Sequence, residues 1–301
     1  EVTRQQVESS LIGKFRVKCL GEVSRYLGID FERRGNCMFM SQTSLIEELC
    51  SKCNLTAGKD SMVPFDHGFV GENQTPFDNH TVYRSVLGMV GWICMCTRPD
   101  VAFYWMFLAG FCNDPRVCHW EHLKKLVAYL RATRALGVLL GCDADQRELE
   151  VFCDASHGDP LLDRRSTSGW VFFLGGAPIA WVARKQKCMS KSSAEAEYIA
   201  MSEMANEAKY YLNILSALCP HINKVFARVD SEPARRIANG DATIRKVKHL
   251  EIAYHHVREM SGLGQIQFDW LTEEHMVADL FTKVMTDKNR FLRLCGYLLH
   301  E

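Results

Sequence analysis

Two acidic side chains follow strand-like runs of apolar residues. The segment Leu149–Asp154 is short and mostly apolar and ends on a carboxylate, and the segment Val225–Val229 is followed by Asp230 in the same way. Alternate residues of a strand face opposite sides, so Asp154 shares a face with Phe152. If the two strands are parallel neighbours, both acids emerge at the same sheet edge, where open α/β sheets place their sites. A buried carboxylate there needs a cation or hydrogen-bond donors.

A third acid, Glu197, is predicted to lie on the buried side of a helix. The residues Ser192-Ser193-Ala194-Glu195 form a capping-box pattern, in which a serine oxygen caps the helix and Glu195 reaches back to it. The helix is expected to run to about Leu218, and its apolar stripe, extended backwards, falls on Glu197. The stripe consists of Met201, Met204, Ala208, Tyr211, Leu212 and Leu215. Glu195 falls on a polar face, so Glu197 is the acid that turns inward.

A fourth acid, Asp279, is predicted to lie in a helix that follows a strand over residues 265–271. Four carboxylates on separate elements would repel one another strongly if the fold gathered them without counter-ions. Divalent cations remove that repulsion, and ligands that are all oxygen favour Mg²⁺ or Mn²⁺. Two such ions about 3.5–4 Å apart stabilise both the attacking and the leaving oxygen in phosphodiester cleavage. The four acids therefore indicate a two-ion site for phosphodiester hydrolysis.

The elements that must position these acids lie in residues 147–301, which we predict to be one domain. A hairpin is expected there, with strands over 169–174 and 179–183 joined by Gly175-Gly176-Ala177-Pro178. The chain before it divides by composition into a small α+β region, a linker rich in Gly, Pro, Asp and Asn, and an apolar helical region. These three parts are residues 1–57, 58–81 and 82–146. The expected strands of the first part are 15–19, 26–31 and 36–40, with a helix over 43–53, and the expected helices of the third part are 83–96, 101–112 and 120–132.

Composition limits the class of protein. The chain has 301 residues, 47% of them hydrophobic and 24% charged, and its formal net charge is zero, which is typical of a soluble globular protein. The longest apolar runs, 86–96 and 101–112, are shorter than the roughly 18 residues of a membrane span, so we expect no membrane partner. Thirteen cysteines without framework spacing favour reduced thiols and a cytoplasmic or nuclear protein. The first residue is Glu and no signal peptide is recognised, which indicates a piece of a longer chain.

Groups of basic residues flank the acids although the whole chain is neutral. They are Arg184, Lys185, Lys187 and Lys191 before Glu197, and Arg235, Arg236, Arg245, Lys246 and Lys248 after Asp230. Such groups contact phosphates without regard to sequence, which favours a nucleic-acid partner, although a solvated charged face has the same composition. Another group has the residue types of a zinc site, but its spacing fits no closed tetrahedral motif. It consists of Cys112, Cys118, His119 and His122.

Motifs that follow one another along the chain resemble the ribonuclease H domain of copia-type retrotransposon Pol polyproteins. They are Cys153-Asp154-Ala155, Asp163-Arg164-Arg165-Ser166-Thr167-Ser168-Gly169, Ser192-Ser193-Ala194-Glu195-Ala196-Glu197-Tyr198, Lys248-His249, Tyr254-His255, Arg258-Glu259, Ala278-Asp279 and Thr282-Lys283. Motifs further upstream are similar to the end of the same family's reverse transcriptase, including its primer grip. They are Leu27-Gly28-Ile29, Tyr83-Arg84-Ser85, Thr97-Arg98-Pro99-Asp100 and His119-Trp120. Each motif is weak alone, and their order over nearly the whole chain makes the set specific.

The resemblance implies an α/β fold with a five-stranded mixed sheet and flanking helices, preceded by an α+β remnant of the reverse-transcriptase palm and a helical thumb or connection region. It implies an enzyme, a ribonuclease H that hydrolyses the RNA strand of an RNA/DNA hybrid with two Mg²⁺ or Mn²⁺ ions, and it implies the other Pol polyprotein domains as partners. The family's metal-binding acids fall on Asp154, Glu197, Asp230 and Asp279. The substrate-binding positions that it implies are Arg164, Arg165, Ser166, Ser193, Lys248, His249 and His255.

The sequence departs from the family pattern in several places. The paired aspartates of the polymerase belong upstream of Glu1, so the chain is expected not to polymerise DNA by itself. Ser231 stands where the family has Asn, and Arg235-Arg236 stand where it has apolar residues. The segment 239–243 lacks the family's His. The alternative to the enzyme is a decayed or domesticated copy that binds nucleic acid or takes part in assembly without catalysis.

Overall fold

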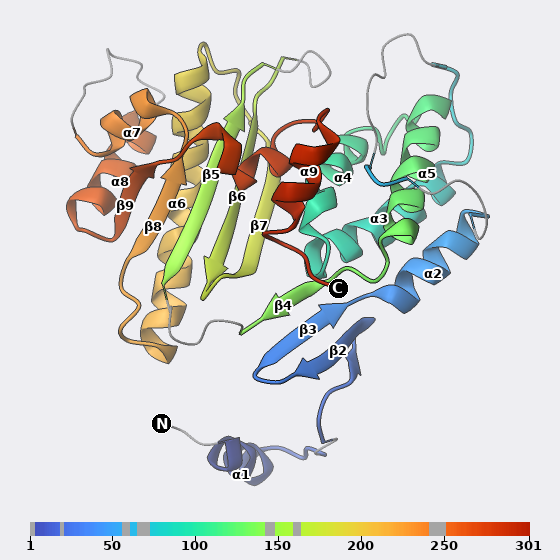
Figure 1. Ribbon diagram of the computed structural model, residues 1–301, viewed down its shortest axis with the longest axis horizontal. Helices are drawn as coiled ribbons and strands as arrows, with labels where there is room; N and C mark the ends of the chain where they lie inside the picture. The colour runs from blue at the N-terminus through green and yellow to red at the C-terminus, as the bar shows by residue number, and fades with distance from the viewer. Residues whose placement is uncertain are drawn as a thin grey trace.

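The structure is a computed structural model that describes residues 4–18, 21–55, 61–64, 73–141, 148–158, 164–240 and 251–301. In these residues, helices pack on two β-sheets (Figure 1). The first sheet has the order β1 (Arg25–Tyr26), β2 (Ile29–Arg34), β3 (Cys37–Ser41) and β4 (Val138–Leu140). The second has the order β7 (Ala177–Lys185), β6 (Thr167–Leu174), β5 (Leu149–Ser156), β8 (Val225–Val229) and β9 (Ile266–Trp270).

The second sheet is mixed. β5, β6 and β7 pair antiparallel, whereas β8 lies parallel to β5 and β9 lies parallel to β8. Parallel neighbours need crossover connections. Helix α6 (Ser193–Leu218) lies in the connection from β7 to β8, and α7 (Glu232–Ala238) and α8 (Glu251–Gly262) lie in the connection from β8 to β9. This strand order with these directions is that of the ribonuclease H fold, so the expected five-stranded mixed sheet with flanking helices is confirmed.

The hairpin of the second sheet has a shorter turn than predicted. β6 and β7 are joined by Gly175 and Gly176 alone, whose φ angles are 56° and 74°. Two successive residues with positive φ are what a type I′ turn requires, and glycine adopts this conformation without steric cost. Ala177 and Pro178, predicted as turn residues, lie in β7 instead. Proline is tolerated there because β7 is an edge strand.

One hydrophobic core lies between the second sheet and α6. The apolar stripe predicted for this helix is its buried face, apart from Tyr211, which is half-buried. Met201 and Met204 have no exposed surface and pack in the same cluster as Val151 and Phe268 of the sheet. The stripe fixes the rotation of α6 about its axis, and this rotation turns Glu197 toward the sheet.

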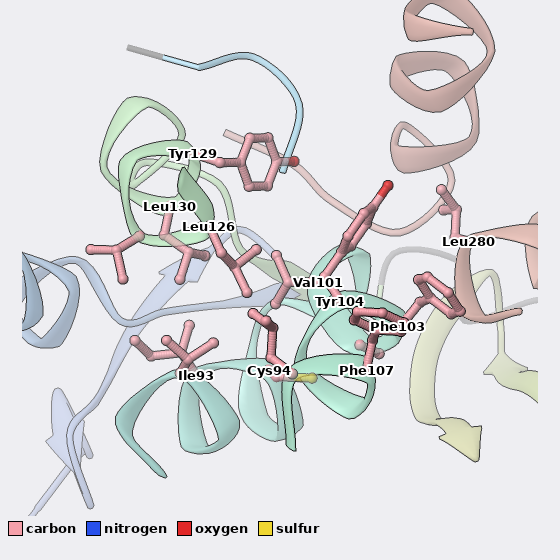
Figure 2. Close-up of a cluster of buried hydrophobic side chains, with 14 of the residues drawn as sticks. Ile93, Cys94, Val101, Phe103, Tyr104, Phe107, Leu126, Tyr129, Leu130 and Leu280 are labelled. Carbon is pink, nitrogen blue, oxygen red and sulfur yellow. The ribbon is translucent and has the colours of Figure 1, made fainter. Parts of the chain in front are cut away.

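A second core joins the helical region to the opposite face of the same sheet. Its helices include α3 (His80–Cys96), α4 (Ala102–Ala109), α5 (Val117–Ala132) and α9 (Lys288–Cys295). Figure 2 shows part of this core, where Leu280 from the C-terminal part of the chain lies on the side of Phe103 and Tyr104 of α4. Val171 and Phe173 of β6 belong to the same cluster. Residues that we predicted in two regions, 82–146 and 147–301, therefore share buried contacts.

The first sheet corrects two predictions. Residues 15–18, predicted as the start of a strand, follow helix α1 (Arg4–Lys14) without forming one. Residues 26–31, predicted as one strand, are divided between β1 and β2 by a turn at Leu27 and Gly28, whose φ angles are 53° and 77°. Helix α2 (Thr43–Lys52) follows β3 as expected. The predicted linker 58–81 is described over 61–64 and 73–81, and α3 begins within it at His80. β4 was not predicted, and it pairs with β3 after the helical region.

A buried ion pair holds the break between α3 and α4. Arg98 and Asp100 have no exposed side-chain surface, and the guanidinium donates to both carboxylate oxygens, at 3.0 and 2.7 Å. Tyr129 donates to the same carboxylate at 2.6 Å, and Thr133 accepts from Arg98. Because these charges are paired and hydrogen-bonded, their burial is tolerated. Pro99 opens the short 3-10 helix η1 (Pro99–Val101), where a missing N–H is harmless.

Candidate metal centre

Three of the four acids predicted from the sequence converge. One carboxylate oxygen from each of Asp154, Asp230 and Asp279 lies within 4.8 Å of the others. Asp154 lies near the end of β5 and Asp230 directly follows β8, and the two strands are parallel neighbours whose carboxyl ends reach one edge of the sheet. Asp279 lies in η5 (Val277–Phe281), a short 3-10 helix. In the part of the chain that the structure describes, this is the one group of His, Cys, Asp or Glu side chains close enough to share a metal ion.

A glycine opposite Asp154 lets η5 approach the sheet. Gly169 of β6 pairs with Asp154, and a Cβ atom at Gly169 would lie 2.6 Å from Thr282 Cγ2 and 2.7 Å from Phe281 Cβ. Any larger residue would therefore push this segment away. The Thr282 hydroxyl donates to Oδ2 of Asp154, which is 2% exposed. The close approach thus brings both Thr282 and Asp279 to Asp154.

Glu197 lies beside this group but is not one of its three close ligands. It is 7% exposed, and its carboxylate interacts with the backbone N–H of Ala155. Burial, together with the carboxylates of Asp154 and Asp230, raises the pKa of Glu197 from 4.5 to about 10. Its carboxyl is therefore protonated at neutral pH when no cation is present.

Glu195, in contrast, serves the start of α6. Ser192 accepts a hydrogen bond from the Glu195 N–H at 3.2 Å, as the capping pattern predicts. The Glu195 carboxylate accepts from the N–H of Lys191 at 2.9 Å, one residue before the position that a capping box uses. Glu195 therefore has a local structural role.

Asp230 and Asp279 also respond to the crowding of carboxylates. Burial and Asp154 raise the pKa of Asp230 from 3.8 to about 6. Burial and Asp154 raise the pKa of Asp279 from 3.8 to about 7, although Lys283 opposes the change. Loss of solvent and repulsion between like charges both favour the protonated acid. A divalent cation among these oxygens would relieve both effects, and the all-carboxylate donor set fits Mg²⁺ or Mn²⁺.

Two basic side chains that we did not predict as site residues contact Asp279. Lys283 Nζ lies 2.8 Å from Oδ1, and Arg290 donates to Oδ2. Burial disfavours the charged form of Lys283, but Asp154 and Asp279 outweigh this effect and its pKa is raised. Lys283 is four residues after Asp279, so this ion pair could have been predicted from the sequence spacing. Arg290 comes from α9, and no local pattern links it to the acids.

The residues predicted to bind substrate differ in exposure where the structure describes them. Arg164, with a positive φ of 56°, and Arg165 are exposed before β6, and Ser193 is exposed at the start of α6. Ser166 is fully buried, and its hydroxyl forms a hydrogen bond of 2.6 Å with the hydroxyl of Ser190. Ser166 therefore stabilises the local fold. The last three positions are His255, which is exposed on α8, and Lys248 and His249, which lie outside the described residues.

Two basic side chains from the groups that flank the acids in the sequence are paired. The Arg184 guanidinium carbon lies over the Trp170 ring, 5.6 Å from its centroid, and Nη2 lies 3.9 Å from Glu207 Oε1. Arg235 forms a hydrogen-bonded ion pair with Glu232. Arg236 is exposed on α7. Arg245, Lys246 and Lys248 lie outside the described residues.

The cysteine and histidine group of the helical region does not gather as a metal site. The His119 ring stacks on Phe111 with 3.8 Å between centroids, and its Nδ1 accepts from the Arg116 N–H. His122 Nδ1 lies 2.9 Å from the Cys118 carbonyl oxygen. These contacts are those of side chains packed in the helical region.

No helix among the described residues combines the length and the apolar character that crossing a bilayer requires.

Sequence comparisons relate the chain to retrotransposon proteins. No family model matches the chain. The chain is 28% identical to the Pol polyprotein of transposon TNT 1-94 from Nicotiana tabacum, over 98% of the chain and 23% of the polyprotein. It is 31% identical to a transposon Ty5-1 protein of Saccharomyces cerevisiae, over 67% of each. Among solved structures, LC11 ribonuclease H1 in complex with an RNA/DNA hybrid aligns with 17% identity and a TM-score of 0.34, over 47% of this chain and 98% of that one.

The strand order and the acid cluster define a ribonuclease H-like domain, here preceded by a segment similar to the end of a reverse transcriptase. The chain belongs to the Pol polyproteins of copia-type retrotransposons. It spans 23% and 19% of the lengths of two plant polyproteins that it matches over more than nine-tenths of its own length.

Proposed function

We propose that the chain is a metal-dependent ribonuclease H that hydrolyses the RNA strand of RNA/DNA hybrids. The observation that carries this proposal is the convergence of Asp154, Asp230 and Asp279 within 4.8 Å, at the carboxyl ends of two parallel strands. Buried carboxylates that raise one another's pKa are a costly arrangement for a purely structural site. Membership of a retrotransposon Pol family supports nucleic acid as the substrate class.

In this proposal, Asp154, Asp230 and Asp279 hold two Mg²⁺ or Mn²⁺ ions, with Glu197 beside them as a further ligand. Such ions neutralise the developing charge on a phosphodiester during in-line displacement. The protein's own part is to orient the ligands and to limit solvent. Thr282 fixes one oxygen of Asp154, and the Ala155 N–H holds the Glu197 carboxyl. Preorganised groups in a site with little water act more strongly than they would in solvent.

The substrate proposal draws on exposed groups near the acids. Arg164 and Arg165 are exposed in the segment before β6, and Ser193 is exposed at the start of the helix that carries Glu197. Arginine contacts to phosphates give binding that does not depend on sequence and that falls as salt rises.

We further propose that the other Pol domains act with this segment, in the cytoplasm or nucleus. The eleven cysteines among the described residues are free thiols, as a reducing compartment favours, and cell fractionation of a tagged chain tests the location.

Cleavage of a labelled hybrid tests the enzyme. The full chain is incubated with Mg²⁺ and an RNA/DNA hybrid, beside Asp154→Asn and the control Glu195→Gln. Glu195 is a suitable control because it is 8% exposed on the same helix as Glu197 but serves the helix start. We expect wild type and Glu195→Gln to cut the RNA strand, and Asp154→Asn or EDTA to abolish cutting. A wild-type chain that binds the hybrid in a band-shift assay without cutting it would leave only the non-catalytic alternative.

A further inference from the structure

Helix α9 reaches the acid site through Arg290. This residue lies in the first turn of the helix, which Asp287 caps by accepting the N–H groups of Asn289 and Arg290 at 2.8 and 3.2 Å. The Arg290 guanidinium donates to Asp279 Oδ2 and, at 2.6 Å, to the carbonyl oxygen of Glu273 in η4 (Glu273–His275). It also lies 3.4 Å from Glu273 Oε1. Arg290 therefore joins α9 to two of the segments that surround the acids.

The helix that carries Arg290 is anchored in the core of the helical region. Phe291 has no exposed surface, and its ring packs edge-on against Tyr129 with 5.9 Å between centroids. Tyr129 in turn donates to the buried carboxylate of Asp100. After α9, His300 and Gly137 exchange backbone hydrogen bonds of 2.9 Å. Residues of the region 82–146 thus help to fix the position of Arg290 relative to the sheet.

We infer that Arg290 is a positioning residue for the metal centre. One nitrogen of the Arg290 guanidinium, Nη2, donates both to the Glu273 carbonyl oxygen and to Asp279 Oδ2, which ties this carboxylate to the backbone of η4. Lys283 Nζ lies 2.8 Å from the other oxygen, Oδ1, so the two basic side chains together hold the orientation of the Asp279 carboxylate. Substitution of groups that orient metal ligands typically weakens metal binding by about 10- to 100-fold. The inference rests on the proposed function, and it makes the helical region part of the nuclease site rather than a mere connector.

Arg293 offers a matched control on the same helix. It donates to Glu274 Oε1 at 2.9 Å and to the Glu274 carbonyl oxygen at 3.3 Å, in parallel with the way Arg290 contacts Glu273. In the described residues, its hydrogen bonds do not include an acid of the cluster. Replacing each arginine by glutamine therefore removes similar contacts to η4, and only one replacement also releases Asp279.

The test measures Mn²⁺ binding by titration calorimetry on the full chain, with thermal unfolding as the check on folding. We expect Arg290→Gln to weaken Mn²⁺ binding by about 10- to 100-fold, and Arg293→Gln to leave it unchanged. Arg290→Lys keeps the charge but loses the planar fork, so it should recover only part of the affinity. If Arg290→Gln does not fold, Arg290→Lys carries the test alone, and wild-type affinity in that variant would overturn the inference.

Two other outcomes separate this inference from the proposed function. Mn²⁺ binding by Arg290→Gln that equals or exceeds that of Arg293→Gln would make Arg290 only a competing cation, and would overturn the inference while leaving the enzyme intact. A wild-type chain that binds no Mn²⁺ and cuts no hybrid would overturn both.

Discussion

Replacing Glu197 by glutamine should stabilise the metal-free protein. Burial, together with the carboxylates of Asp154 and Asp230, raises the pKa of Glu197 in the folded chain from 4.5 to about 10. Below pH 4.5 the folded and unfolded chains both carry the Glu197 proton, so this residue lowers the stability least there. As the pH rises toward 10, the folded chain must keep a proton that the unfolded chain loses, and stability falls. Glu197→Gln imitates the protonated acid and keeps an oxygen for the Ala155 N–H.

The size of the gain follows from the same pKa. At pH 7 the difference from the ordinary pKa of 4.5 is about 2.5 pH units, and at about 1.4 kcal/mol per unit Glu197→Gln gains up to about 3.5 kcal/mol of unfolding free energy. At pH 5 the gain falls below about 1 kcal/mol. Urea unfolding in EDTA measures both values. Glu195→Gln is the control, because it weakens the helix start and is expected to give no gain at either pH.

The addition of Mg²⁺ gives a second check on the same variant. A cation among the acids should stabilise the wild type and raise its unfolding midpoint. The gain should be smaller in Glu197→Gln, which has lost one of the proposed ligands. If Glu197→Gln is no more stable than the wild type at pH 7 in EDTA, or if the stability difference does not change between pH 5 and pH 7, the raised pKa of Glu197 is refuted.

Two further substitutions test the frame around the site. Gly169→Ala should lower the free energy of unfolding by about 1–3 kcal/mol and weaken Mn²⁺ binding, because the added Cβ would lie 2.6 Å from Thr282 Cγ2. The control is Gly88→Ala in α3, where an added Cβ has no atom within 4 Å. This control should stabilise the chain, because alanine favours a helix more than glycine does. Asp100→Asn should cost about 3–5 kcal/mol of unfolding free energy by leaving the buried Arg98 unpaired, whereas Glu32→Gln, which breaks an exposed pair, should leave the thermal midpoint unchanged.

The sequence predicts those parts of the site that local patterns determine. Period-two alternation that ends on an acid located Asp154 and Asp230, and the predicted strand over 225–229 has the bounds of β8. The phase of the apolar stripe on α6 distinguished Glu197 from Glu195, because a helix buries one face. These inferences needed only the geometry of single elements.

Features that depend on packing between distant segments were not predicted. Arg290 reaches Asp279 from α9 because the core around Phe291 positions that helix. The core that the helical region shares with β6 likewise has no local signal in the sequence. The reason is that an apolar helix has the same hydrophobic pattern whether it packs on another helix or on a sheet. The turn at Leu27 and Gly28 was missed because Leu27 is unusual at positive φ.

The most direct test of the central claim is a cleavage assay with hybrids labelled on one strand at a time. With Mg²⁺ present, we expect the full chain to fragment the labelled RNA and to leave the labelled DNA of the same hybrid intact, and we expect Asp230→Asn to fragment neither. Labelled RNA that stays intact with the wild-type chain, or that is fragmented equally by the wild type and Asp230→Asn, would contradict the proposed ribonuclease H activity.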